Sequence, residues 1–207
     1  MLSISAISAV RASQGAIELV GKEWNHDPLK VYVKASSDLS LQVSIVLNDW
    51  SSALEAASGR NVDNSELGRS LPDGVFDFVI VSSSKEADII ISVERGAAAG
   101  LLGMTLLQDK NGDGYFDKAK ITVKAGRGLD VADFRNVMRH EIGHALGLGH
   151  AEDPSDLMHP TYDASATKTD IYPSNLDVCA LRSIYLDDGF GGDNLPPQLI
   201  PSTYSST

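Results

Sequence analysis

Cysteine is almost absent from this chain: Cys179 is the only one among 207 residues. An internal disulfide is therefore excluded, and the fold has to rest on its apolar core. No apolar run is long enough to span a bilayer. Residues 1–21 lack the basic start of a secretory signal peptide, so such a peptide is not evident.

Positive charge is also scarce, with 17 lysines and arginines against 28 aspartates and glutamates and a formal net charge of −11. This balance argues against nucleic acid, an anionic membrane or a strongly acidic substrate as the partner. The acidic residues are spread along the chain, so most of them are best explained as a solvated surface.

The length and the 43% of hydrophobic residues suffice for one good core, so we expect a single domain and a monomer. We place this domain at residues 22–187. Residues 1–21 are small and weakly apolar, and they either pack on the domain or stay mobile. Residues 188–207 are rich in Gly, Pro and Ser without periodicity, which predicts a flexible tail.

The most informative segment runs from His140 to His150 and reads HEIGHALGLGH. On a helix, His140 and His144 lie on one face, one turn apart, so both imidazoles can reach one metal ion. Gly147 permits the backbone angles that turn the chain out of the helix and bring His150 round as a third ligand. Three neutral imidazoles leave a fourth tetrahedral position for water, which indicates a catalytic zinc. Glu141 stands beside the first ligand, where it can take a proton from that water.

The helix that carries this motif is supported without the metal. Asp130 is the expected N-cap, with Asp133 three residues further on. The core-facing apolar stripe comprises Val131, Phe134, Met138, Ile142 and Ala145. The motif's histidines and glutamate occupy a different sector, which predicts a cleft. The alternative is a set of buried, metal-free histidines, but a glycine and a third histidine at fixed offsets make a chance match rare.

The motif and the residues after it, from Asp153 to Tyr162 (DPSDLMHPTY), resemble the metzincin metallopeptidases and, within them, the matrixins. The shared features are an Asp-Pro pair, a Leu-Met pair, a proline two residues past the Met and a tyrosine two past that proline. The resemblance implies that Met158 is the Met-turn residue, an apolar floor beneath the zinc and not a ligand. It also implies that Pro160, Thr161 and Tyr162 form the wall of the pocket for the substrate side chain just after the scissile bond.

Two positions depart from the matrixin pattern. Ala151 stands where the family usually has a small hydroxyl residue, and His159 stands where it usually has an aromatic one. We expect His159 at the rim of the site and not on the metal. A second, structural zinc, which family members often hold, is not expected, because only His26 and His159 remain outside the motif.

The resemblance extends to residues 174–185, which are similar to the last helix of the family. Ser174 is the expected N-cap of this helix. Its apolar surface comprises Leu176, Cys179, Ala180, Leu181 and Ile184. Of the two adjacent acids that matrixins carry here, only the second is kept, as Asp177. By resemblance Asp177 braces the Met-turn backbone from behind, and the helix dipole would favour an acid at this position as well.

Upstream, the patterns predict a sheet and one helix. Apolar residues at helical spacing from Leu39 to Leu54 predict a helix that stops near Gly59. Strands are expected at Leu29–Lys34, Val75–Val81, Asp88–Val93, Gly103–Leu107 and Ala119–Lys124, the last two as a hairpin. With the resemblance, this order implies the α+β metzincin (zincin-like) fold: a twisted five-stranded mixed sheet with an active-site helix, a Met-turn and a C-terminal helix.

In metzincins, the first strand of this hairpin is the sheet edge that pairs with extended substrate. The resemblance therefore assigns backbone contacts with a bound peptide to five residues: Gly103, Met104, Thr105, Leu106 and Leu107. An apolar edge strand without such a function would be an aggregation hazard, which favours a functional edge.

A second motif lies inside the hairpin and matches positions one, three, five, six and nine of an EF-hand loop: Asp109, Asn111, Asp113, Gly114 and Asp117. Position twelve is Lys120 instead of a bidentate Glu, and no helix is predicted on either side, so the segment is not an EF-hand. Two interpretations remain open. The segment is either a calcium loop that also includes Tyr115, or a polar hairpin tip, since Asn-Gly and Asp-Gly favour tight turns.

Together these residues predict a zinc-dependent endopeptidase. Zinc on the three histidines would lower the pKa of its water from about 15.7 toward ~7, and Glu141 would take the proton and later deliver it to the leaving nitrogen. Two alternatives are a zinc hydrolase of a non-protein amide, such as a cell-wall cross-link, and a zinc-binding protein without turnover. The presence of Glu141 argues against the second. The resemblance implies polypeptide substrates in extended conformation and a secreted or cell-surface location.

Overall fold

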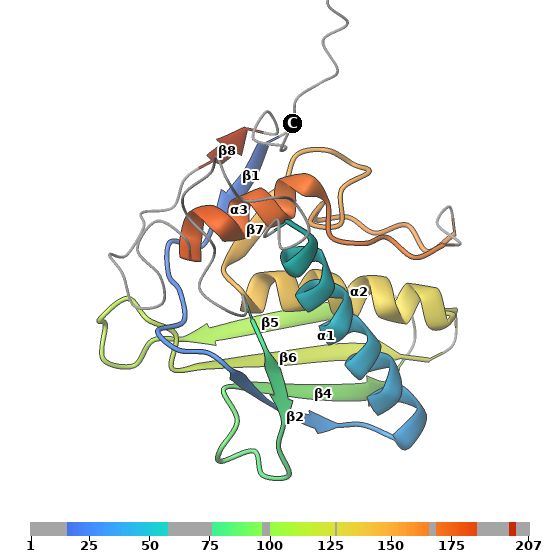
Figure 1. The fold of residues 1–207 in the computed structure, drawn as a ribbon. Helices are drawn as coiled ribbons and strands as arrows, with labels where there is room; N and C mark the ends of the chain where they lie inside the picture. Colours follow the sequence, from blue (N-terminus) through green and yellow to red (C-terminus); the bar gives the residue numbers. More distant parts are fainter. Residues whose placement is uncertain are drawn as a thin grey trace, which may run out of the picture.

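The computed structural model describes residues 16–57, 76–96, 100–126, 128–165, 169–185 and 199–201 (Figure 1). Its elements, in chain order, are β1 (Ala16–Leu19), β2 (Leu29–Lys34), α1 (Ser37–Ala57), β3 (Phe78–Ile80), β4 (Ile89–Arg95), β5 (Gly103–Gln108), β6 (Lys118–Ala125), α2 (Val131–Ala145), β7 (Leu148–Ala151), α3 (Asn175–Tyr185) and β8 (Leu199–Pro201). Among the helices in these ranges, none is both long and apolar enough to cross a membrane.

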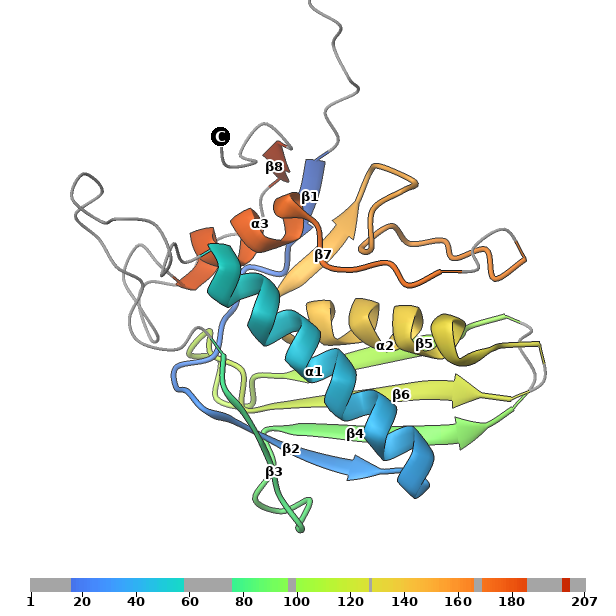
Figure 2. The ribbon, with the colours of Figure 1, turned by 45° about the vertical axis from the view of Figure 1, so that its right-hand side comes forward.

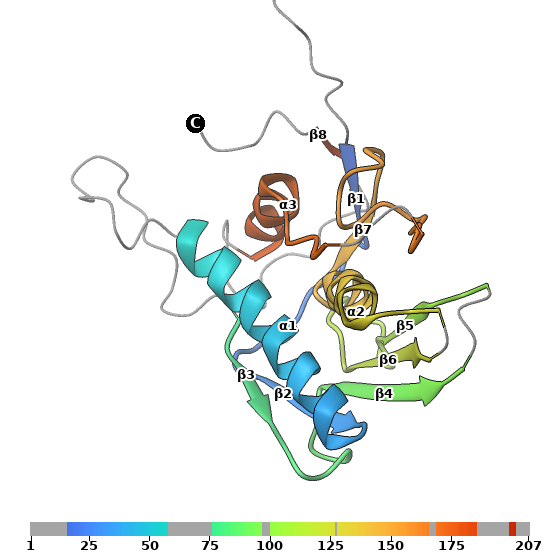
Figure 3. The ribbon, with the colours of Figure 1, turned by 90° about the vertical axis from the view of Figure 1, so that its right-hand side faces the viewer.

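Five strands form the main sheet in the order β3-β2-β4-β6-β5. β5 runs antiparallel to β6 and every other neighbouring pair is parallel, so the sheet is mixed. Both α1 and α2 lie on one face of this sheet and contact each other (Figures 2 and 3). The predicted α+β fold, with its five strands, its preceding helix and the β5–β6 hairpin, is confirmed.

The core lies between the sheet and these two helices. Alternate residues of the central strands point into it, among them Val31 of β2, Ile91 of β4 and Ile121 of β6, all of which are buried. Burying each such side chain contributes roughly 1.5–3 kcal/mol to stability. Trp50 of α1 is buried as well, and its indole N–H donates to the backbone oxygen of Arg139 in α2 over 3.0 Å. This bond fixes α2 to α1.

A small second sheet, with the order β7-β1-β8, has no counterpart in the sequence patterns. β1 pairs antiparallel with both neighbours, and its Ile17 and Leu19 are buried. Strands of three or four residues are too short to show a period, and their partners are distant in the chain. β1 belongs to the expected N-terminal segment 1–21, and β8 to the expected tail 188–207, most of which lies outside the described residues. The domain limits 22–187 stay a prediction.

Two further details differ from the patterns. β3 begins only at Phe78, because Phe76 has a φ of 59°, which is not a strand conformation; Val75 and the helix stop at Gly59 lie outside the described residues. Val131 is 52% exposed, although the helical stripe assigns it to the core. Val131 is the first residue of α2, so the helix itself continues on only one side of it, toward the C-terminus.

Candidate metal centre and active-site cleft

Local interactions close both ends of α2. Asp130 accepts a hydrogen bond from the Asp133 N–H at 2.9 Å, and the Asp133 carboxylate accepts one from the Asp130 N–H at 2.8 Å, so the predicted N-cap is part of a capping box. After the helix, Gly147 has a φ of +106°. A side chain there would be strained, and its Cβ would come within 3.0 Å of the Lys22 backbone oxygen. The chain then turns into β7, which carries His150.

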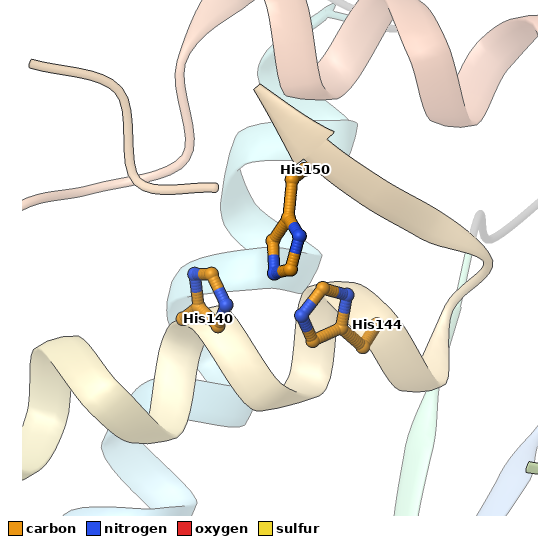
Figure 4. Close-up of side chains that lie close together, drawn as sticks. All are labelled: His140, His144 and His150. Atoms are coloured by element: carbon orange, nitrogen blue, oxygen red, sulfur yellow. The ribbon is translucent and has the colours of Figure 1, made fainter. Parts of the chain in front are cut away.

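The three histidines meet at one point (Figure 4). His140 and His144 project from α2, and His150 extends toward them from β7. One ring nitrogen of each lies within 4.8 Å of those of the other two, and the ring centroids are 4.5 to 5.5 Å apart. This spacing leaves room for one shared zinc ion about 2 Å from each nitrogen.

Backbone carbonyls determine which nitrogen of two rings faces this point. His140 Nδ1 lies 2.8 Å from the Leu157 oxygen, and His144 Nδ1 lies 2.9 Å from the Leu148 oxygen. A carbonyl oxygen can only accept, so each Nδ1 carries the proton and each Nε2 offers its lone pair. Burial, helped by the neighbouring histidines, lowers the pKa of both rings, for His144 to about 4. Neutral, oriented imidazoles are what a zinc site needs, so the donor set fits the metal.

Glu141 lies beside His140 on α2 and contacts strand β5. Only 5% of its surface is exposed. The Thr105 hydroxyl lies 2.6 Å from Glu141 Oε2 and 2.9 Å from the Glu141 backbone oxygen. Gly103 lies against the other carboxylate oxygen, where an added Cβ would overlap with it. Burial raises the pKa of Glu141 to about 7, and the Thr105 hydrogen bond offsets part of this rise. A carboxyl group with such a pKa can both take and give a proton.

Met158 is completely buried and packs against α2. A Cβ added at Gly143 would come within 2.5 Å of the Met158 sulfur, so the two residues are in close contact. The Met158 backbone oxygen accepts a hydrogen bond from the Ala151 N–H at 2.9 Å, which joins the turn to β7. Met158 therefore lies next to the helix turn that links His140 and His144.

Behind Met158, two carboxylates and one serine join α3 to the turn. Asp156 accepts hydrogen bonds from the Met158 N–H at 2.8 Å and from the Ser174 hydroxyl at 2.7 Å. The Ser174 hydroxyl also accepts from the Asp177 N–H, and the Ser174 N–H donates to Asp177, which confirms Ser174 as the N-cap. Asp177 is fully buried, and burial first and the Asp156 carboxylate next raise its pKa well above the usual value. These bonds connect Asp177 to the turn through Ser174 and Asp156.

The histidines open into a cleft of about 740 Å³. Gly103, Met104 and Thr105 line it from β5, whereas Leu106 and Leu107 continue the strand beyond it. All three expected wall residues, 160–162, line it as well. His159 also lines the cleft, and its Nδ1 lies 3.1 Å from the Thr161 backbone oxygen.

The wall of the cleft is fixed to α2 by Tyr162. Its hydroxyl donates to the Asp133 carboxylate at 2.7 Å and accepts from the Asn136 side-chain amide at 3.1 Å. Asn136 in turn accepts from the Ile171 N–H and donates to the Thr169 oxygen. Tyr162 and Ile171, at the two ends of the segment that follows the wall, are therefore both held on α2.

The loop between β5 and β6 carries the expected calcium ligands. Asp109 accepts hydrogen bonds from two loop N–H groups and, at 2.7 Å, from the ammonium of Lys22. The other expected ligands also make hydrogen bonds within the loop: Asn111, Asp113, Tyr115 and Asp117. Lys22 supplies a positive charge next to Asp109, so the loop can close without a metal ion. Both interpretations of this loop stay open, and calcium stays a prediction.

Three features of the site leave no signal in the sequence. They are the contact of the Thr105 hydroxyl with Glu141, the carbonyls of Leu148 and Leu157 that orient two histidines, and the role of Asp156. Each depends on groups that only the folded chain brings together, so neither spacing nor composition could have pointed to them.

Curated proteins similar to this chain are metallopeptidases by name. The chain is 32% identical over 139 residues to matrix metalloproteinase-20 from Homo sapiens, an overlap of 62% of this chain and 24% of that protein. It is 28% identical over 181 residues to karilysin from Tannerella forsythia, which covers 81% of this chain and 34% of that protein. It is 46% identical over 102 residues to matrilysin from Rattus norvegicus, which covers 41% and 38%. The chain thus spans well under half the length of these relatives.

A family model described as Matrixin matches residues 24–186. The match runs through the main sheet, the active-site helix, the segment around Met158 and the last helix. It confirms the resemblance that the residues from His140 to Tyr162 indicate. Since the match covers most of the chain, the chain belongs to the matrixin family.

Proposed function

We propose that this protein is a zinc-dependent endopeptidase that cleaves extended polypeptides, with Glu141 as general base and general acid. The observation that carries the proposal is the convergence of three imidazoles beside a buried carboxylate, in a cleft bordered by a sheet edge. Names among the relatives, such as matrix metalloproteinase-20 and macrophage metalloelastase, support the same class of reaction.

His140, His144 and His150 would hold the zinc through the ring nitrogens that face one another. Bound there, zinc supplies Lewis acidity, which lowers the pKa of water and polarises the carbonyl of the scissile bond. The carbonyls of Leu148 and Leu157 keep two of the rings in the required orientation.

Glu141 moves the proton. As a carboxylate it takes a proton from the attacking water, and as a carboxylic acid it returns that proton to the leaving nitrogen when the peptide bond breaks. Because burial raises its pKa to about 7, both forms are accessible near neutral pH. Proton transfer of this kind typically contributes ~10²–10⁴-fold to the rate, so this residue should dominate turnover without being needed for zinc binding.

We assign structural roles to three residues around the ligands. Gly147 turns the chain so that His150 reaches the other histidines, which its φ of +106° supports. Met158 forms the apolar floor against α2. Asp177 braces this floor from α3, through Ser174 and Asp156.

Strand β5 would bind the substrate as an additional strand. The Lys124 N–H donates to the Leu102 oxygen, so in an antiparallel ladder the alternate residues Gly103, Thr105 and Leu107 turn their N–H and C=O groups to the free edge. These groups would hydrogen-bond to an extended peptide, while the side chains of Met104 and Leu106 lie at the exposed face beside it.

The side chain after the scissile bond would enter the pocket between α2 and the wall formed by Pro160, Thr161 and Tyr162. Val137 and Leu157 line the same cleft, so an apolar side chain fits it best. Tyr162 is anchored to α2 by its hydroxyl, which gives this pocket a fixed wall.

Family membership supports a secreted or cell-surface location, and we take the active form to be a monomer. Neither alternative activity has an observation of its own in its favour. A hydrolase of a non-protein amide does not need a peptide-binding sheet edge, and a zinc protein without turnover does not need a buried carboxylate beside the ligands.

Digestion of an unfolded protein by the zinc-loaded chain tests the proposal. Wild type should release peptides, Glu141→Ala should release almost none, and cell-wall fragments should stay intact with both. Turnover of wall fragments alone would favour the non-protein amide, and the absence of any cleavage by zinc-loaded wild type would remove the proposal.

A further inference from the structure

Strand β5 contacts the Glu141 carboxylate through two alternate residues. The Thr105 hydroxyl lies 2.6 Å from Oε2, and Gly103 leaves the space that Oε1 occupies, because any Cβ there would overlap with that oxygen. Both residues belong to the face of β5 that is turned to α2, as the alternation along a strand requires. One carboxylate oxygen is thus held by a hydrogen bond, and the other fits a space that only glycine provides.

We propose that Thr105 is a positioning residue for the general base, and that Gly103 provides the space in which the Glu141 carboxylate lies. This inference rests on the proposed function, since it presupposes that Glu141 moves the proton. Thr105 is not itself a catalytic residue: its hydroxyl acts on the reaction only through the orientation of Glu141.

The chemistry of a hydroxyl suits this role. A glutamate side chain has three rotatable bonds, and a base that is displaced by a fraction of an ångström transfers a proton poorly. The Thr105 hydroxyl lies within hydrogen-bond distance of both the Glu141 carboxylate and, at 2.9 Å, the Glu141 backbone oxygen. Its single hydrogen can be donated to either acceptor, so the hydroxyl holds the carboxylate close to its own helix. A hydroxyl can donate to a carboxylate and accept from a carboxylic acid, so the contact persists while Glu141 takes and returns the proton.

The position of Thr105 also connects the base to the substrate. Its backbone groups turn to the free edge of β5, where the peptide is proposed to pair, while its side chain contacts Glu141 from the face turned to α2. A peptide that pairs with this edge therefore meets a base whose place is set by the same strand.

Side-chain variants at Thr105 separate positioning from packing. Thr105→Val keeps the shape and the strand propensity but removes the hydroxyl, and Thr105→Ser keeps the hydroxyl. We expect Thr105→Val to lower kcat about ten- to hundredfold with KM within about twofold, which corresponds to one hydrogen bond to a charged group. Thr105→Ser should restore kcat to within about threefold of wild type. Thr122→Val is the matched control: Thr122 is opposite Met104 in β6, on the other face of the sheet, and its loss should leave kcat unchanged.

Zinc content is measured on the same variants, because loss of the metal would also lower kcat. All four proteins should bind one zinc. A double-mutant cycle on the zinc-free protein gives a readout without activity: Thr105→Val should change the unfolding midpoint in wild type but not in Glu141→Ala, because the partner is gone.

The outcomes separate this inference from the proposed function. If Glu141→Ala is inactive while Thr105→Val matches wild type in kcat and shows no coupling to Glu141, the positioning role is overturned and the general base stands. If Glu141→Ala keeps wild-type kcat, the proposed function fails first. If Thr105→Ser is as slow as Thr105→Val, the hydroxyl is not the group that matters, which also overturns the inference.

Discussion

The sulfur of Met158 lies so close to Gly143 of α2 that an added Cβ would come within 2.5 Å of it. Trp50 closes the same space from α1, with its Cζ2 atom 3.1 Å from that position. Glycine inside a helix costs roughly 0.5–1 kcal/mol relative to alanine. Here the glycine lets Met158 approach the helix between His140 and His144.

Gly143→Ala should therefore destabilise the protein, although alanine favours the helix. Overpacking of a tight core typically costs about 1–3 kcal/mol, which exceeds the gain in helix propensity. Urea unfolding of the zinc-free variant measures this cost. In a Met158→Ala background the sulfur is gone, so the same substitution should cost much less. An equal cost in both backgrounds would show that Met158 is not what Gly143 accommodates.

Gly147→Ala should weaken zinc binding as well as folding. A φ of +106° is strained for alanine, at a cost of about 1–3 kcal/mol, and its Cβ would press on the Lys22 backbone. Relief of that strain would move His150 away from the other two rings. Gly112→Ala is the matched control, since Gly112 has a φ of +73°, open space around it and no place in the zinc site. Gly112→Ala should lower the stability of the protein but leave its zinc affinity at the wild-type value. Competition with a chelator measures this affinity.

Asp170 should contribute stability at neutral pH that is lost in acid. The hydrogen bonds from Arg135 have the largest effect on the pKa of Asp170 and lower it. Burial opposes part of this shift, and the hydrogen bond from Arg139 lowers the pKa further, to about 2. The contribution is complete above the unfolded pKa of about 3.9 and disappears as the pH falls toward 2. The shift corresponds to about 2–3 kcal/mol at most, and solvent screening reduces this to about 1 kcal/mol.

Asp170→Asn should accordingly lower the free energy of unfolding at pH 7 by about 1 kcal/mol or more, because Arg139 is buried and would lose one of the two carboxylates that pair with it among the described residues. Urea titrations between pH 7 and pH 3 should show the gap between variant and wild type narrowing below about pH 4. A gap that is constant over this range would mean that the charge of Asp170 is not what stabilises the fold.

Calcium distinguishes the two interpretations of the β5–β6 loop. A calcium loop predicts that millimolar Ca²⁺ raises the Tm and that Asp113→Ala abolishes the rise, because a ligand that binds only the folded state stabilises it. Calorimetry with Ca²⁺ and, as a control, with Mg²⁺ measures the effect. If neither ion raises the Tm, the remaining interpretation is a polar hairpin tip in which Lys22 is the charge partner of Asp109.

The sequence predicts those features of the fold that depend on residues close together in the chain, and it does not predict those that depend on residues far apart. The capping box at Asp130, the stripe from Phe134 to Ala145 and the alternating strands are local patterns, so they predict α2 and the main sheet correctly. β1 and β7 are four residues long and pair across most of the chain, so no local pattern predicts them. Val131 fits the stripe but is exposed, since periodicity does not say where a helix leaves its packing partners.

The candidate site divides in the same way. The spacing of the three histidines predicts the zinc ligands because one helix and one turn set it. The contact between Thr105 and Glu141 joins residues 36 positions apart, and the one between Asp156 and Ser174 joins residues 18 apart on different elements. Such contacts depend on how sheet, helix and turn pack together, which a single sequence does not state.

The central claim is that three histidines bind the metal while Glu141 does the chemistry. Zinc stoichiometry and turnover of an unfolded protein, measured together on wild type, Glu141→Ala and His144→Ala, test it most directly. We predict one zinc with turnover for wild type, one zinc with a loss of ~10²–10⁴-fold for Glu141→Ala, and neither tightly bound zinc nor turnover for His144→Ala. Full turnover by Glu141→Ala, or loss of its zinc, would contradict the account.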